Sequence, residues 1–213
     1  LSCYADHYSF PWLRHNISSP DQGNDYYLNG LLNFNSKNNV VIRYNISLQS
    51  VKKERAGTGI DLTGKSKRNS LRISYNYEIN RDLQFETRFD CTGYSEDNTN
   101  YTQGYYLGQK VIFRPERKKI GLWCSYGLFD IPEWKNRIYI YENDVLYDFS
   151  VPALYRTGSR FSAMIKSTLF CNIDFWIKYY VSYYGKIAER GAGVDLIKSN
   201  TDSGIKLQIR IKI

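Results

Sequence analysis

The residues that most constrain this chain are its last ten, GIKLQIRIKI, in which apolar and polar side chains alternate without a break. Ile or Leu occupies every odd position from 205 to 213, and Lys, Gln or Arg occupies every even position from 206 to 212. A period of two residues is typical of a β-strand, because successive side chains point to opposite faces of the sheet. One face of this strand is therefore expected to contact apolar material, and the other face water or polar groups.

The same period recurs along most of the chain. It is clear in segments 40–49, 71–79, 83–90 and 173–184, and it holds with one or two violations in segments 3–13, 26–35, 104–114, 119–129 and 158–167. Strands of about 9–11 residues match the thickness of a bilayer, whereas strands of soluble proteins are nearer 5–6 residues. No segment approaches the roughly 18 consecutive apolar residues of a membrane-spanning helix. The pattern predicts long two-faced strands and excludes a helical membrane protein.

The connections between these segments alternate in length. Short ones at 36–38, 80–82, 115–118 and 168–172 alternate with long ones at 14–25, 52–69, 95–103, 130–157 and 185–203. Short turns at one end and long loops at the other are typical of outer-membrane barrels. We therefore predict an all-β protein, an antiparallel up-and-down transmembrane β-barrel of about ten strands in the bacterial outer membrane. It is a single domain over 1–213, either closed by these strands or the C-terminal part of a larger barrel.

A second fold class is compatible with the aromatic content. The chain has 20 Tyr, and aromatic residues make up 16% of it. Such residues form girdles at membrane interfaces, but they also line the binding sites of glycan-binding β-sandwiches. The alternative is therefore a soluble, secreted β-sandwich that binds glycans, with Trp134 or Trp176 lining a groove.

The long region 130–157 has its own pattern. RIYIY (137–141) and VLYDFSV (145–151) flank Glu142-Asn143-Asp144, which predicts a hairpin with its turn at the three polar residues. In a barrel this region is an extracellular excursion that stands above the membrane or folds over the pore mouth.

The net charge of +8 is concentrated on the predicted polar faces of the strands. Basic residues far outnumber Glu78, Glu86, Asp90 and Asp174 there. The predicted binding residues of a basic lumen are Arg43, Arg72, Arg88, Lys110, Arg160, Lys178, Lys206 and Arg210. Such a lumen can favour anionic solutes, attract an acidic plug segment or admit nucleic acid. The simpler interpretation is that these charges pair with one another and hydrate the interior, as Glu86 and Asp90 would around Arg88.

Other partners follow from the predicted location. These are outer-membrane lipid, the barrel-assembly machinery and lipopolysaccharide, whose phosphates would contact a basic loop cluster made up of Lys52, Lys53, Arg55, Lys65, Lys67 and Arg68.

No motif points to catalysis. The stretch 59–66 matches the pattern G-x-x-x-x-G-K-[ST] of a phosphate-binding loop, but an alternating strand follows it where such a loop needs a helix. His7 and His15 have no carboxylate or thiol constellation around them, and the four Cys show no metal-ligand spacing. We therefore expect a non-enzymatic protein without catalytic residues, metal or cofactor.

Three stretches carry a resemblance to a known family. RIYIYENDVLYDFSVPALYRTGSRFSAMIK (137–166), GAGVDLIKSNTDSGIKLQIRIKI (191–213) and HYSFPW (7–12) together resemble the C-terminal barrel-like region of large helix-hairpin-helix proteins of the Bacteroidota. The resemblance implies an outer-membrane-type barrel without the N-terminal helix-hairpin-helix segments, which bind DNA backbone in related competence proteins. A barrel of this kind is expected to act as a channel or as an anchor for an uptake or secretion apparatus, DNA uptake included. The chain departs from most outer-membrane barrels by finishing on Ile213 and not on an aromatic residue, and a longer parent barrel with more strands is the expectation.

Overall fold

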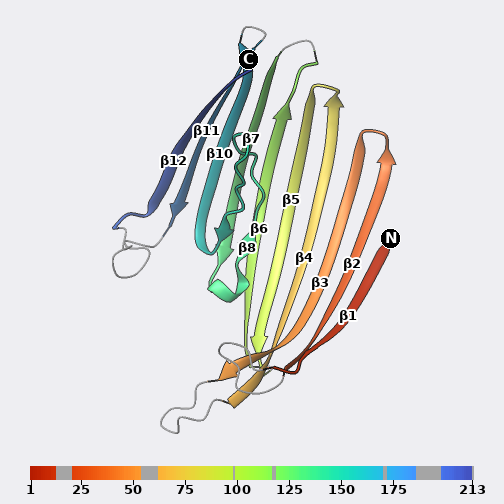
Figure 1. The fold of residues 1–213 in the computed structure, drawn as a ribbon. Helices are drawn as coiled ribbons and strands as arrows, with labels where there is room; N and C mark the ends of the chain where they lie inside the picture. The colour runs from red at the N-terminus through yellow and green to blue at the C-terminus, as the bar shows by residue number, and fades with distance from the viewer. Residues whose placement is uncertain are drawn as a thin grey trace.

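The protein is described by a computed structural model that covers residues 1–12, 21–53, 62–97, 99–116, 119–169, 172–185 and 198–212. Ten long strands form one antiparallel sheet in the order β1-β2-β3-β4-β5-β6-β7-β10-β11-β12 (Figure 1). These strands are β1 (Ser2–Phe10), β2 (Asp21–Asn35), β3 (Asn38–Lys53), β4 (Leu62–Asn80), β5 (Leu83–Glu96), β6 (Thr99–Phe113), β7 (Ile120–Ile131), β10 (Arg156–Leu169), β11 (Ile173–Tyr184) and β12 (Thr201–Ile211). The prediction of an all-β, antiparallel chain is confirmed.

Several strands are longer than the alternation indicated, with 16 residues in β3, 19 in β4 and 14 in β5. Strand β11 has the predicted bounds, and β1 ends earlier than predicted, at Phe10. The long loop predicted at 95–103 is wrong, because β5 ends at Glu96 and β6 begins at Thr99. Asp97 adopts a left-handed backbone with φ of 48°, and its carboxylate accepts a hydrogen bond of 2.8 Å from the Lys65 amide. Polar residues there indicated a loop, although they lie on strands that continue past the apolar part of the sheet.

Short turns gather at one end of the sheet. Strands β2 and β3, β4 and β5, β6 and β7, and β10 and β11 are joined at the end that lies uppermost in Figure 1. The opposite end carries the longer connections, with the β5–β6 turn as the exception. The predicted alternation of short and long connections is otherwise confirmed.

The sheet is curled but open. Strands β1 and β12 lie at its two edges, and each pairs with one neighbour only (Figure 1). The prediction of a closed ten-stranded barrel is therefore not met within the described residues. These residues also form one large sheet, not the two facing sheets of a β-sandwich. No helix among them is long and apolar enough to cross a membrane.

The convex face of the sheet is apolar. It exposes large side chains from nearly every strand, among them Leu28, Tyr44, Phe89, Leu107, Leu128, Ile165, Tyr179, Ile205, Leu207 and Ile209. On β12 the apolar side chains from Ile205 to Ile211 are 64–66% exposed. The chain exposes 14003 Å² in total, against about 10,000 Å² for a typical soluble monomer of its mass. The convex face therefore leaves large apolar side chains of many strands uncovered.

Part of the concave face is covered by residues 132–155, which we call the inner hairpin. It contains the 3₁₀ turn η1 (Trp134–Asn136) and the two-stranded ribbon of β8 (Ile138–Tyr139) and β9 (Ala153–Leu154), and it folds back across the sheet (Figure 1). Its apolar side chains pack against the sheet in two clusters. One contains Tyr106, Phe129, Ile131, Ile138, Ile140, Leu154 and Tyr184, and the other contains Val145, Met164 and Trp176.

The predicted hairpin at 137–151 forms, but its turn lies at other residues than predicted. Glu142 bridges Ser150, so the chain reverses between these two residues and not at 142–144. The hairpin also lies against the hollow of the sheet. Trp176 is buried beneath it and lines no open groove, whereas Trp134 is 52% exposed.

Candidate functional site

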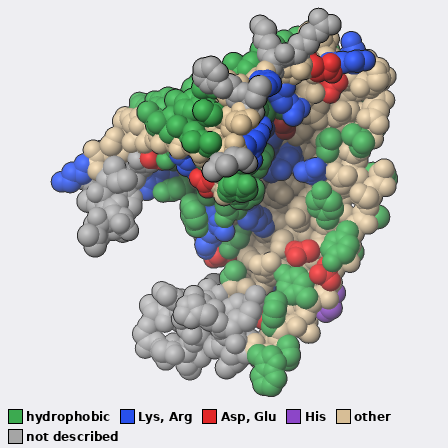
Figure 2. Space-filling view, turned by 45° about the horizontal axis from the view of Figure 1, so that its top comes forward, with side chains coloured by type: hydrophobic (Ala, Val, Ile, Leu, Met, Phe, Trp, Pro, Cys, Tyr) green, Lys and Arg blue, Asp and Glu red, His purple; other side chains and the backbone are tan. Residues whose placement is uncertain are grey.

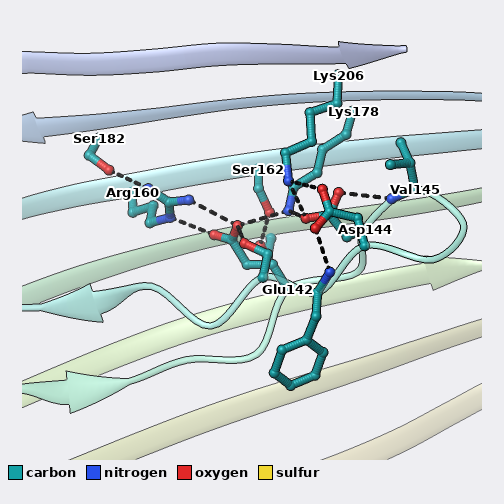
Figure 3. A network of polar contacts seen from close by, with 12 residues as sticks. Glu142, Asp144, Val145, Arg160, Ser162, Lys178, Ser182 and Lys206 are labelled. Atoms are coloured by element: carbon teal, nitrogen blue, oxygen red, sulfur yellow. Dashed lines mark hydrogen bonds and ion pairs between the residues drawn. The ribbon is translucent and has the colours of Figure 1, made fainter. Parts of the chain in front are cut away.

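Acidic side chains of the inner hairpin contact basic side chains of β10, β11 and β12 (Figure 3). Glu142 accepts two hydrogen bonds from Arg160, at 2.5 Å from Nε and 3.0 Å from a terminal nitrogen. Lys178 Nζ lies 3.3 Å from Glu142 and 2.9 Å from Asp144. Arg160, Lys178 and Lys206 each occupy a polar position in the alternation of their strand. The same two-residue period that predicted the strands therefore places these three side chains on the concave face.

Lys206 extends this group toward the sheet edge. Its Nζ donates to Asp144 at 2.9 Å and to Asp148 at 2.6 Å. We call Glu142, Asp144, Asp148, Arg160, Lys178 and Lys206 the hairpin network. Three carboxylates from the hairpin thus meet three cations from three adjacent strands.

The network lies partly in a dry environment. Lys178 is fully buried, and Glu142 and Arg160 are nearly so. The Arg160 guanidinium also donates to Ser182 at 2.7 Å and lies 4.9 Å from the centre of the Tyr180 ring. Burying charges is costly unless they are paired and hydrogen-bonded, so these cations require the hairpin carboxylates.

The protonation of the hairpin carboxylates reflects these contacts. Burial alone would raise the pKa of Asp144, but hydrogen bonds from Lys206 and Lys178 lower this pKa below its ordinary value. The hydrogen bond from Lys206, together with one from the Phe149 amide, lowers the pKa of Asp148. Both carboxylates are therefore ionised at neutral pH.

Two further carboxylates on the concave face, those of Asp90 and Asp174, each form ion pairs with two nearby cations. Asp90 lies 2.6 Å from Arg72 and 2.5 Å from Arg88, which confirms the predicted charge ladder at this carboxylate. Asp174 pairs with Arg210 on the neighbouring strand, and with Lys212 at 3.0 Å.

All eight predicted lumen residues lie on the concave face. Six of them pair with the carboxylates described above: Arg72, Arg88, Arg160, Lys178, Lys206 and Arg210. The other two have different neighbours. Lys110 lies 5.3 Å from the centre of the Tyr141 ring, and Arg43 donates to Asn29 at 3.4 Å. Figure 2 shows Lys and Arg side chains gathered in the hollow of the molecule.

Two basic residues of the concave side, Arg68 and Arg137, were not predicted from the sequence to lie there. Arg68 was expected in an external loop but lies in β4, where it donates to the Arg137 carbonyl at 2.7 Å. Arg137, at the base of the inner hairpin, had no predicted role. The even numbering that Arg68 shares with Arg72 could have placed it on the concave face.

The other residues of the predicted basic loop cluster also differ from the prediction in their location. Lys65 and Lys67 lie in β4, Lys52 and Lys53 fall within the bounds of β3, and Arg55 lies outside the described residues. The cluster is therefore largely part of the sheet.

Three sequence features considered for chemistry fall at least partly within the described residues. Residues 62–66 of the phosphate-loop pattern belong to β4, which continues as a strand to Asn80. His7 shares a hydrogen bond of 2.7 Å with Asn24 in an exposed position, and His15 lies outside the described part. Within that part no three His, Cys, Asp or Glu side chains group as metal ligands, and Cys3, Cys91 and Cys124 are free thiols.

The chain matches no protein-family model and no curated protein. The resemblance to the barrel-like region of helix-hairpin-helix proteins stays a prediction.

Proposed function

We propose that this chain forms the strands of a non-enzymatic bacterial outer-membrane β-barrel, whose basic lumen is filled by the inner hairpin and which serves as a channel or as an anchor for an uptake or secretion apparatus. The observation that carries the proposal is the inverted polarity of the sheet. Charged pairs lie on the concave face, partly beneath the inner hairpin, and large apolar side chains lie exposed on the convex face. A soluble sheet has the opposite arrangement.

The convex face supports lipid contact. Monomeric soluble proteins rarely expose contiguous apolar patches larger than a few hundred Å². Here, apolar side chains are exposed on strands from β1 to β12. Lipid chains would cover this band, and lipopolysaccharide would contact its outer rim. Insertion would depend on the barrel-assembly machinery.

The hairpin network supports a closed resting state of the lumen. Three hairpin carboxylates are held by Arg160, Lys178 and Lys206, so the acidic plug considered from the sequence is supplied by the chain itself. Release of the hairpin would expose a basic surface that favours anions. The proposal includes transport of DNA or another polyanion through this lumen.

Fractionation tests the membrane part of the proposal. The full chain, exported to the periplasm of a Gram-negative host, should sediment with the outer membrane and resist extraction with carbonate. Unboiled and boiled samples should migrate differently on a denaturing gel. A chain that stays in the soluble periplasmic fraction, with identical migration in both samples, would contradict the proposal.

A further inference from the structure

A second region of the concave face is rich in arginine and lies apart from the hairpin network. A cavity of about 250 Å³ is lined by guanidinium groups from three elements. Arg43 comes from β3, Arg68 and Arg72 from β4, and Arg137 from the base of the inner hairpin. We call this the arginine cavity.

The charges of the arginine cavity are not balanced by the protein. Its lining contains four guanidinium groups and one carboxylate, that of Asp90. Asp90 is already shared by Arg72 and Arg88. Within the described residues, Arg43, Arg68 and Arg137 have no carboxylate partner. This contrasts with the hairpin network, where every cation has one.

The guanidinium groups are held in place by neutral partners. Arg68 donates to the Arg137 carbonyl at 2.7 Å. Arg137 donates to the Tyr139 hydroxyl at 2.6 Å and to the Trp134 carbonyl at 3.1 Å, and it lies 4.8 Å from the centre of the Trp134 ring. Such contacts orient a guanidinium without neutralising it, so the groups are prepared for an oxyanion.

An adjoining cavity suits neutral polar groups. It measures about 510 Å³ and shares Asn45, Arg68, Ser70 and Arg137 with the arginine cavity. Ser47, Gln49 and Tyr94 add hydroxyl and amide groups to its wall, which also carries Lys135 and the carboxylate of Asp25. Hydroxyls and amides can donate to and accept from the hydroxyl groups of a ligand.

We propose that the two cavities bind a small polyhydroxylated anion, a sugar that carries a phosphate or carboxylate group. The oxyanion lies among Arg43, Arg68 and Arg137, and the hydroxylated body lies along the adjoining polar wall. This site goes beyond the proposed function, because binding on the concave face does not depend on insertion into a membrane.

Calorimetric titration tests the proposal with the folded full chain in detergent micelles. The probes are glucose 6-phosphate and glucuronate, with glucose as the uncharged control. Either anionic probe should bind saturably, and glucose should bind at least about tenfold more weakly, because it lacks the charge-assisted hydrogen bonds.

Substitutions locate the binding. Arg43→Gln removes only the 3.4 Å hydrogen bond to Asn29 from the apo protein, and Arg68→Gln removes a guanidinium shared by both cavities. Each should weaken anion binding by about tenfold or more, the loss expected for a hydrogen bond to a charged group. Arg81→Gln is the matched control, since Arg81 is exposed in the turn between β4 and β5. It removes the same charge and should leave affinity within about twofold. Thermal unfolding verifies that each variant is folded.

Several results would overturn this inference. They are equal binding of glucose, absence of binding by both anionic probes, or a loss in Arg81→Gln as large as that in Arg43→Gln. Displacement of the probes by single-stranded DNA with an affinity that rises with strand length would replace the sugar with nucleic acid. Failure of the membrane proposal would appear separately, in the fractionation.

Discussion

Lys178 is the residue whose environment depends most on the inner hairpin. Its side chain is fully buried, and its ammonium group lies 3.3 Å from Glu142 and 2.9 Å from Asp144, both on the inner hairpin. A buried ammonium group without such partners would cost several kcal/mol. Docking of the hairpin is therefore governed by charge as much as by the apolar contacts of Val145 and Ile140.

Glu142→Gln should weaken this docking. The substitution keeps the side-chain size but leaves Arg160 without its carboxylate and Lys178 with Asp144 alone. Removing one partner of a buried ion pair typically costs about 3–5 kcal/mol. Chemical unfolding should show a loss of this order, and limited proteolysis should cut within 143–149. The control Glu133→Gln, at an exposed position of the same hairpin, should unfold like the parent chain. Equal stability of both variants would mean that charge does not hold the hairpin.

Acid should release the hairpin. Docking lowers the pKa of Asp144 and Asp148, so their contribution to docking is complete above their ordinary pKa and is lost as pH falls through the lowered values. The window lies below about pH 4, where Lys206, whose pKa is raised by these two carboxylates, stays charged and loses its partners. Hydrogen exchange of the Ile140 and Glu142 amides, which donate across the hairpin, should show protection factors that fall in this window. In a variant with Asp144→Asn and Asp148→Asn they should be low already at pH 7. Constant protection down to pH 2 in the parent chain would refute this linkage.

At the scale of elements, the strands could be predicted from the sequence and the docking of the hairpin could not. A period of two residues is local, so segments such as 40–49 and 173–184 revealed both their strands and their faces. The contact of Glu142 with Arg160 joins residues 18 apart and follows no period. Glu142 and Asp144 were interpreted as turn residues, although the excess of basic residues on the concave face called for acidic partners. Arg68 was missed because the polar stretch 52–69 was assigned to a loop, and Arg137 because its hairpin was expected above the membrane or over the pore mouth.

Close packing between strands makes one glycine of β10 hard to replace. A Cβ on Gly158 would lie 2.1 Å from the Tyr183 carbonyl oxygen on β11, a distance that only a backbone shift can relieve. Gly158→Ala should therefore destabilise the β10–β11 pairing by about 1–3 kcal/mol, as overpacking does. Gly30→Ala on β2 is the control, since the nearest atom to its Cβ would be 3.8 Å away. Urea unfolding of both variants measures the difference. Equal midpoints would show that the sheet absorbs the clash.

The inner hairpin should also control permeation under the proposed function. Combining Glu142→Gln with Asp144→Asn removes two of the three carboxylates of the hairpin network and leaves the cations of the sheet in place. In planar bilayers we expect this variant to conduct more than the parent chain and to favour chloride over potassium. Glu133→Gln should conduct like the parent. Unchanged conductance in the double variant would mean that the hairpin does not obstruct the lumen.

At the scale of the whole molecule, an added charge is expected to destabilise the protein on one face of the sheet and to be tolerated on the other. Leu207 is 64% exposed on the convex face, whereas its neighbour Gln208 lies on the concave face. In lipid vesicles, Leu207→Arg should destabilise the protein by about 2–4 kcal/mol, the cost of a basic residue facing the bilayer midplane. Gln208→Arg adds the same charge on the polar side and should cost much less. Reversible unfolding in vesicles measures both variants, and an equal cost would argue against lipid on the convex face.

The open edges of the sheet set the composition of any membrane-inserted particle. Within the described residues, β1 and β12 each pair with a single neighbouring strand, and hydrocarbon offers no hydrogen bonds to the backbone of an open sheet edge. In a bilayer both edges must therefore be occupied by other strands. If β1 pairs with β12 of the same chain, the particle is a monomer with a narrow ring. If each edge pairs with another chain, the stoichiometry rises, and the diameter of the ring grows in proportion to its strand number.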